Sequence, residues 1–357
     1  MFEHVAESFI AVLEPFLLVG AAVLAGMVGY LIVHRGVDEI RFQRRRRLTE
    51  YYRKTVDRLL QPETSESSLR TLALVPAAHK AVVGAMLLKP LALATGSVVD
   101  RLREGARAAG LIPIWTDRVS SGSWWVRADA VRALGLVREK SALRSVSAAL
   151  DDEHEEVRAA AVEALGLIGD ERSIQVLLDR LGDSSRYQRV RIVEALREFG
   201  DIATPALVRH ARRCRADVAT VADILGLIGG HAATEELSRW VADPEAEIRG
   251  AALRSLGTIG LDDDGVGIAV RALDDPAAGV RAAAARALGR ARREEAAPQL
   301  ARHLDDEWIV AASSADALRR LGQPGQAALQ ARVADPGYAG ELAHQMLWER
   351  RAEAAGA

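Results

Sequence analysis

The chain has 357 residues, of which 49% are hydrophobic and only 4% aromatic, so it is long enough for several domains or one long repeat array. Its formal net charge of −2 argues against nucleic-acid binding through bulk charge. The single cysteine, Cys214, excludes an intramolecular disulfide and any metal site built from several cysteines. We expect this cysteine to be half-buried and structural.

The first predicted element is a transmembrane helix over residues 9–34, which follows a short extracytoplasmic N-terminus at 1–8. From Pro15 to Val33 the chain has 19 residues without a charge, and at about 1.5 Å per residue these nearly span a hydrocarbon core of about 30 Å. A cleaved signal peptide, which would leave a soluble secreted array, is the alternative. The acidic start MFEHVAE and the exit into HRGVDEIRFQRRRR favour an uncleaved anchor.

Charges on either side of this span predict its orientation. No Lys or Arg precedes it, whereas Arg35–Arg58 holds nine Lys or Arg and four acids. Because positive flanks stay in the cytoplasm, we expect a single-pass protein of the inner (plasma) membrane, with its N-terminus outside and the rest of the chain inside. Residues 35–62 are expected to form a basic juxtamembrane helix.

Two features near the membrane have both a functional and an ordinary interpretation. Small residues at four-residue spacing, which are Ala21, Ala25 and Gly29, could pack against a partner transmembrane helix, or could reflect normal membrane-helix composition. Four consecutive arginines, Arg44, Arg45, Arg46 and Arg47, could contact anionic lipid, or could serve only as a topology signal.

Residues 63–123 contain helical patches without a clear repeat and are expected to form a degenerate helical cap. Trp115 lies in this segment, and Trp124 and Trp125 follow it. We expect these aromatic side chains to cover the exposed end of a repeat array, with an exposed recognition patch as the alternative.

From residue 124 to the C-terminus a unit of about 30 residues repeats. Its marker is a leucine, called the repeat leucine below, which recurs at intervals of 29 to 32 residues as Leu134, Leu165, Leu196, Leu225, Leu256, Leu288 and Leu318. Such a period predicts a solenoid of antiparallel helix pairs, in which neighbours share one continuous core. The tail from Gly340, with Leu347 at the marker position, is expected to be a terminal cap.

Other columns repeat with the leucine. An arginine stands seven residues before it at Arg127, Arg158, Arg189, Arg249 and Arg281, and a glycine follows it at Gly135, Gly166, Gly226, Gly257 and Gly289. An Asp-Pro turn precedes several of these helices, for example at Asp275-Pro276. Aspartate is expected to accept hydrogen bonds from free N–H groups at the helix start, and proline to occupy the first helical position.

The pattern D-P-x-x-x-V-R-x-A-A-x-x-A-L-G, cleanest at Asp274–Gly289, resembles the HEAT repeat of the short bacterial variety also named after phycobilisome lyases. The resemblance covers about residues 124–350. It implies an all-α, right-handed α-solenoid whose second helices line the concave side, and protein–protein scaffolding far more often than catalysis.

Candidate catalytic and metal motifs fail on their spacing. His154-Glu155 lacks the second histidine of a zinc protease, because Arg158 stands at the fifth position. The His-Glu pairs of HEAT-type hydroxylases would fall on Ala159-Ala160. A calcium loop aligned on Gly265 would need carboxylates at Gly260 and Arg271.

We therefore predict no catalytic residue, no metal and no cofactor. His154, Glu155 and Glu156 are expected on a solvated surface where the repeats vary.

The column two residues before the repeat leucine predicts where a partner would bind. It reads Arg132, Glu163, Glu194, Asp223, Arg254, Arg286 and Asp316. Because the buried face is set by Val and Leu, this column should face outward. Glu163, Glu194 and Asp223 then present an acidic stripe beside Arg254 and Arg286, although an ordinary solvated face is the simpler interpretation.

The sequence thus predicts a membrane-anchored, non-enzymatic cytoplasmic scaffold that binds a protein partner, but no nucleic acid. A lyase-type chaperone or enzyme of the phycobilisome-lyase class is the alternative, and a bound chromophore or metal in the purified protein would favour it.

Overall fold

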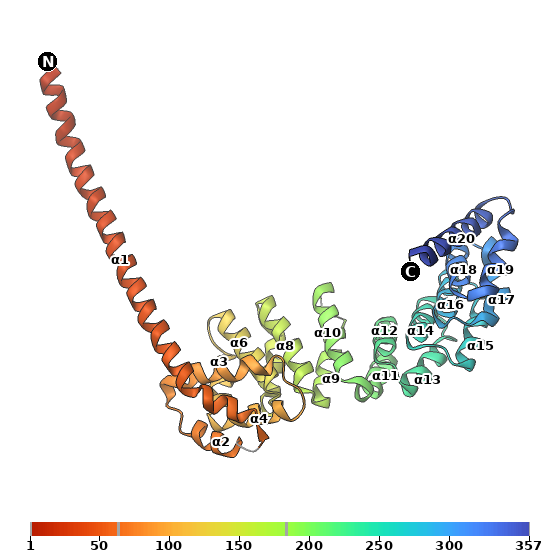
Figure 1. Ribbon diagram of the computed structural model, residues 1–357, viewed down its shortest axis with the longest axis horizontal. Helices are drawn as coiled ribbons and strands as arrows, with labels where there is room; N and C mark the ends of the chain where they lie inside the picture. The colour runs from red at the N-terminus through yellow and green to blue at the C-terminus, as the bar shows by residue number, and fades with distance from the viewer. Residues whose placement is uncertain (1, 63–64, 183–184, 357) are drawn as a thin grey trace. The chain divides into compact units, whose positions relative to one another are not determined.

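The computed structural model describes residues 2–62, 65–182 and 185–356, with side chains from residue 26 onward apart from 65, 186, 187 and 351–356, and also that of Leu24. Within these residues the protein is all-helical, with α-helices α1 to α20, short 3₁₀ turns and no strand (Figure 1). The chain forms two compact units, residues 1–115 and 116–357. The expectation of an all-helical solenoid is confirmed, whereas its handedness stays a prediction.

The first unit is built on the end of the long helix α1 (Phe2–Leu59). The other helices of the unit are α2 (Ser65–Ala73), α3 (Lys80–Leu91), α4 (Ser97–Ala108) and the start of α5 (Leu111–Arg118). Tyr52, Val56 and Leu59 of α1 are buried in its core. The Arg101 guanidinium donates to the carbonyl oxygens of Leu59 (3.2 Å) and Leu60 (2.7 Å), so α4 satisfies acceptors that the end of α1 leaves free.

The second unit is a stack of helix pairs, and the second helix of each pair contains a repeat leucine. These second helices are α6 (Trp124–Leu136), α8 (Glu155–Ile168), α10 (Arg186–Glu198), α12 (Val218–Ile228), α14 (Ala246–Ile259), α16 (Ala278–Ala291) and α18 (Trp308–Arg320). Each packs on the next in chain order (Figure 1). All seven repeat leucines are buried, which confirms the predicted shared core.

The first helices of the pairs are shorter. Those that precede α8 to α18 are α7 (Leu143–Ala148), α9 (Glu171–Leu178), α11 (Thr204–Arg213), α13 (His231–Trp240), α15 (Asp263–Ala272) and α17 (Ala297–Arg302). Helices α19 (Gly322–Arg332) and α20 (Tyr338–Gly356) end the stack. Leu347 of α20 is buried, at the position that the repeat pattern gives it.

Glycine after the repeat leucine lets successive second helices approach closely. A Cβ built on Gly135 would lie 2.6 Å from Cα and Cβ of Ala164, and one on Gly257 would lie 2.8 Å from Cα of Ala287. These separations are too short for a side chain, so the glycine column is a packing requirement of the stack.

Three arginines of the column link their repeat to the next one. In Arg127–Asp152, Arg249–Asp275 and Arg281–Asp306, the guanidinium Nε and Nη2 donate to both carboxylate oxygens at 2.6 to 2.8 Å. These paired bonds lower the pKa of Asp152 and Asp275, and lower that of Asp306 to about 2.

The turn aspartates do not have the predicted position. Helix α14 begins at Ala246, two residues after Pro244, so the proline precedes the helix and is not its first residue. Asp243 accepts from the backbone N–H of Glu245, the residue that precedes α14, at 2.9 Å. The aspartate closes a short turn before the helix, which leaves its carboxylate oriented for arginine.

His154 and the tryptophans also differ from expectation. His154 caps α8, because its Nδ1 accepts from the Glu156 N–H at 3.3 Å, and its ring stacks on Trp124 with centroids 4.1 Å apart. Trp115 is buried, whereas Trp124 and Trp125 are exposed. Of the three tryptophans expected to cover the end of the repeat array, only Trp115 is therefore buried.

Candidate functional site

The predicted binding column lies on the surface of the second helices. Glu163, Glu194, Asp223 and Arg254 are exposed, and Arg132, Arg286 and Asp316 are partly exposed. Because the second helices pack in order, these positions form one strip along the second unit. Their role in binding stays a prediction.

Two of the acids line a groove on α8 and α10. The groove has a volume of about 630 Å³. It is lined by Arg138, Glu163, Gly166, Leu167, Gly169, Arg191, Glu194, Ala195, Arg197 and Glu198. The structure therefore brings Glu163 and Glu194 together and surrounds them with three arginines, which sequence reasoning missed.

The groove lies where the helix packing loosens. A Cβ on Gly166 would lie 3.1 Å from Cβ of Ala195, compared with 2.6 Å for Gly135 and Ala164. After the next repeat leucine the glycine is replaced by Arg197, and among the described residues α10 packs less closely on α12 than the other neighbouring second helices pack on each other. The exchange adds a charged side chain to the lining of the groove.

Arg138 enters the groove from an uncommon backbone conformation. It follows α6 with a φ of 51°, and its N–H donates to the Gly135 carbonyl at 2.8 Å. The Glu139 N–H donates to the Leu134 carbonyl at 3.1 Å, which completes a left-handed helix end that glycine normally occupies. Most equivalent positions are glycines, so an arginine in this column was a signal available in the sequence.

Asp223, Arg254 and Arg286 of the predicted column interact with neighbouring side chains. Arg254 lies 3.7 Å from Asp223, whose pKa is raised by burial and less strongly lowered by Arg254. Arg286 donates to the Ser313 hydroxyl at 2.8 Å, and burial together with Arg254 and Arg290 lowers its pKa. Asp223 is thus partly neutralised, whereas Arg254, Arg286 and Arg290 form a basic cluster.

The two ends of the strip are neutralised within the chain. Arg132 lies 3.5 Å from both Asp129 and Glu156. Asp316 pairs with Arg319 at 2.8 Å and with Arg320 at 3.0 Å. The α8–α10 groove and the basic cluster lie between these two paired ends.

The predicted membrane residues are described in part. Ala21 and Ala25, like residues 9–23 of the expected span, lie outside the residues whose side chains are described. Gly29 is exposed, and a Cβ built on it would have none of the described atoms within 4 Å. Arg44 to Arg47 are exposed.

Among the described residues, no single helix is long and apolar enough to cross a membrane. One pair bent by 111°, Glu66–Ala73 with Ala77–Leu91, meets the length and composition criteria together.

A second group of chemically active side chains was not predicted. His210, Cys214 and Asp217 lie together on α11 and the turn after it. Cys214 is exposed and not half-buried. The spacing H-x₃-C-x₂-D was the signal, but it occurs in a single repeat and does not match the columns of the others.

Comparison with known proteins identifies the repeats. Residues 112–197 and 235–319 match the family model of HEAT repeats, so the expected resemblance is confirmed over these segments. The match stops at Arg197 and resumes within α13, so it omits α11 and α12. No curated protein matches the sequence.

Several solved structures are similar to parts of this chain. The complex of CpcE and CpcF of phycocyanin lyase from Nostoc is 20% identical, covering 67% of this chain and 94% of that chain with a TM-score of 0.31. Human deoxyhypusine hydroxylase is 21% identical over 77% of this chain and 96% of that chain, with a TM-score of 0.30. Kap121p bound to Pho4p is 14% identical, covering 77% of this chain and 42% of that chain, with a TM-score of 0.40.

Proposed function

We propose that this HEAT-repeat protein is a non-enzymatic scaffold, anchored in the membrane by the start of α1, which holds a cytoplasmic protein partner at the membrane. The partner binds along the strip that joins the α8–α10 groove to the basic cluster. The protein localises this partner or regulates it there.

The observation that carries the proposal is the composition of the groove. Glu163 and Glu194 stand in register on neighbouring helices, with Arg138, Arg191 and Arg197 beside them. Arg254 and Arg286 follow on the same strip two and three helices further along. Alternating charge of this kind favours a partner segment of complementary charge, and fixes its register more than it adds affinity.

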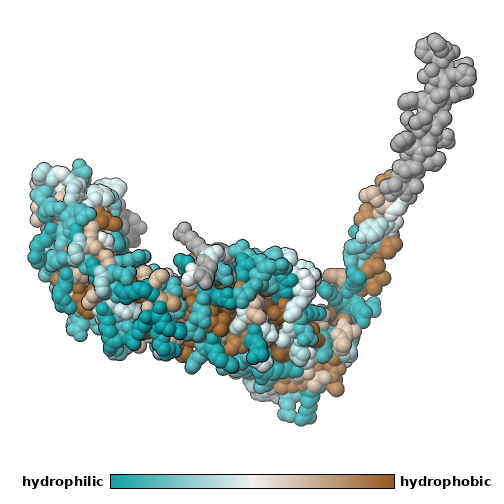
Figure 2. All heavy atoms as spheres, turned by 180° about the vertical axis from the view of Figure 1, so that it is seen from behind, coloured by the Kyte–Doolittle hydropathy of each residue, from teal (hydrophilic) through white to brown (hydrophobic). Residues whose placement is uncertain are grey.

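Support for the membrane anchor comes from the described part of α1. Its large apolar side chains between Leu24 and Val33 are 48 to 68% exposed (Figure 2). A continuous apolar surface of this kind marks an interaction site. The exposed arginines Arg44 to Arg47 follow on the same helix and form a basic segment of the kind that attracts anionic lipid.

The test is charge reversal of the acidic half of the strip. Native membranes that contain the protein are crosslinked, and partners are recovered and identified from wild type and from the triple variant Glu163→Lys, Glu194→Lys, Asp223→Lys. The partner recovered with wild type should fall at least about tenfold in the variant, because three attractive contacts become repulsive.

A matched variant separates the strip from net charge. Glu104→Lys, Glu171→Lys, Glu341→Lys changes the charge equally at exposed acids outside the strip. It should recover the partner normally, and both variants should unfold within about 1 kcal/mol of wild type, as expected for surface substitutions. Equal recovery with all three proteins would show that the strip does not bind the partner.

A further inference from the structure

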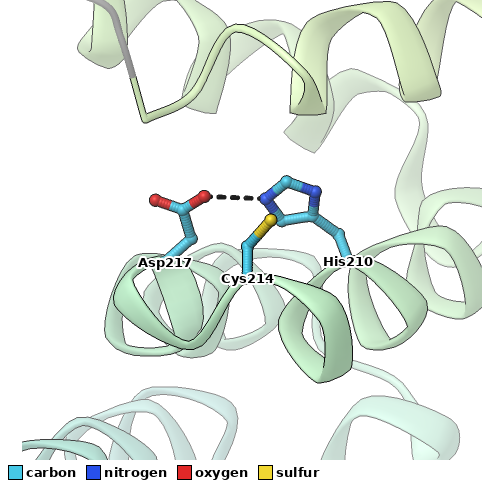
Figure 3. Close-up of side chains that lie close together, drawn as sticks. All are labelled: His210, Cys214 and Asp217. Carbon is cyan, nitrogen blue, oxygen red and sulfur yellow. Dashed lines mark hydrogen bonds and ion pairs between the residues drawn. The ribbon is translucent and has the colours of Figure 1, made fainter.

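The side chains of His210, Cys214 and Asp217 converge on one point at the end of α11 (Figure 3). One potential ligand atom from each residue lies within 4.8 Å of the other two. The imidazole Nε2 of His210 is 2.8 Å from Oδ2 of Asp217. His210 is only 3% exposed, whereas Cys214 faces solvent, so the cluster has a buried base and an open side.

Backbone hydrogen bonds hold the three residues in this arrangement. Cys214 ends α11 and its N–H donates to the His210 carbonyl at 2.8 Å. The Asp217 N–H in turn donates to the Cys214 carbonyl at 3.1 Å. The side chains are therefore positioned by the helix end itself, and ordering them costs little additional conformational entropy.

Among the described residues, Asp217 neither caps the helix that follows it nor pairs with the arginines beside it in the chain. It stands at the N-cap of α12, yet its side chain does not cap that helix. The neighbouring arginines bind other groups, since Arg213 donates to Gln175 at 3.3 Å and Arg215 donates to Glu245 at 2.7 Å. Among the described residues, the ion-pair partner of Asp217 is His210.

The donor set suits a divalent transition metal. Zinc binds thiolate sulfur at about 2.3 Å, and imidazole nitrogen and carboxylate oxygen at about 2.0 to 2.2 Å, so its ligand atoms stand roughly 3 to 4 Å apart. The present separations need shifts of an ångström or less to reach that geometry. A thiolate and a carboxylate also neutralise the two charges of the ion, which matters beside Arg213 and Arg215.

We propose that His210, Cys214 and Asp217 form a binding site for a divalent transition-metal ion of the zinc type, with three protein ligands and a fourth position open to solvent. The ion replaces the hydrogen bond between His210 and Asp217. The thiol proton passes to solvent, and the imidazole binds in its neutral form, with its proton on the ring nitrogen that does not coordinate. The site does not depend on the proposed partner strip.

The test uses the full chain, purified without a histidine tag and freed of metal. Co²⁺ alone is the optical probe, because a cobalt–thiolate bond gives a charge-transfer band in the near ultraviolet, and calorimetry follows Zn²⁺ alone. Wild type should bind one ion and show the band. Cys214→Ser should lose the band, and Cys214→Ser and Asp217→Asn should each bind Zn²⁺ at least about tenfold more weakly.

His231→Gln is the matched control, because His231 is exposed at the start of α13 and lies outside the cluster. It should bind both ions like wild type. Cys214→Ser exchanges an exposed side chain, so its thermal unfolding without metal should match that of wild type. Absence of the cobalt band in wild type, or Zn²⁺ binding that Cys214→Ser leaves unchanged, would overturn the proposal.

Discussion

Arg138 and Arg292 occupy the same position of two repeats, just after a second helix, and both have a φ of 51°. Gly169, Gly200 and Gly229 at the equivalent positions reach positive φ without strain. For a residue with a Cβ, this left-handed conformation raises the free energy of the folded state by about 1 kcal/mol. At Arg138 the strain places a guanidinium in the groove, whereas Arg292 lies outside it.

This pair of arginines separates stability from binding. Arg138→Gly and Arg292→Gly should each raise the free energy of unfolding by up to about 1 kcal/mol, because each removes the strain of a left-handed residue. Only Arg138→Gly should weaken partner capture, by about fivefold, because only Arg138 lines the groove. Urea unfolding and quantified crosslinking measure the two effects, and equal losses of capture would argue against a specific role for Arg138.

At the scale of the helices, close stacking depends on the glycine that follows the repeat leucine in five of the seven repeats. Gly257 meets the backbone of Ala287, and Gly226 and Gly289 make equally close approaches to α14 and α18. An added methyl group cannot be accommodated by rotating a side chain, since the atoms it meets belong to the facing backbone. The cost falls on the interface between two repeats and not on either helix alone.

A substitution pair tests this packing. Gly257→Ala should lower the free energy of unfolding by about 1 to 3 kcal/mol, because α14 and α16 must separate to admit the Cβ. Gly279→Ala, which meets no atom within 4 Å near the start of α16, should raise it by up to about 1 kcal/mol. Chemical unfolding of both variants gives the comparison, and a stabilised Gly257→Ala protein would contradict the packing account.

The sequence predicted those features that recur in every repeat. The repeat leucines, the order of the helices and the outward column follow from spacing, because each repeat faces the same packing problem. Features made by contact between repeats were missed. The aspartate partners of Arg127 and Arg281, the stacking of His154 on Trp124 and the arginines of the groove all depend on which turn lies beside which helix. A spacing within one repeat does not contain that information.

At the scale of the whole molecule, the two ends of α1 have different surroundings. Its last turns carry Tyr52, Val56 and Leu59 into the core of the first unit, while residues 24–33 expose apolar side chains. A deletion that tests the anchor should therefore end before residue 41, so that the last turns of α1 and the core residues they carry are kept. Removing all residues up to 60 would also take out part of the core.

Deletion of residues 2–36 should release the protein from membranes. The full chain should stay in the membrane pellet after an alkaline carbonate wash, because an apolar span is held by the hydrophobic effect and not by charge. The shortened chain should appear in the wash. Persistence of the shortened chain in the pellet would show that another part of the protein holds it there.

A second variant distinguishes the span from the arginines. Replacing Arg44 to Arg47 by glutamine in the shortened chain should abolish its salt-sensitive binding to vesicles that contain anionic lipid, since each arginine contributes about 1 kcal/mol. In the full chain the same replacement should leave carbonate resistance unchanged.

The loose contact between α10 and α12 has a mechanical consequence. A stack of helix pairs carries tension from one interface to the next, so its stiffness is limited by the weakest interface. Under an axial pull the array would lengthen first between these two helices, where no glycine follows the repeat leucine. Two stiff blocks would separate before either is deformed, and a partner seated in the adjacent groove would experience the load at one end only.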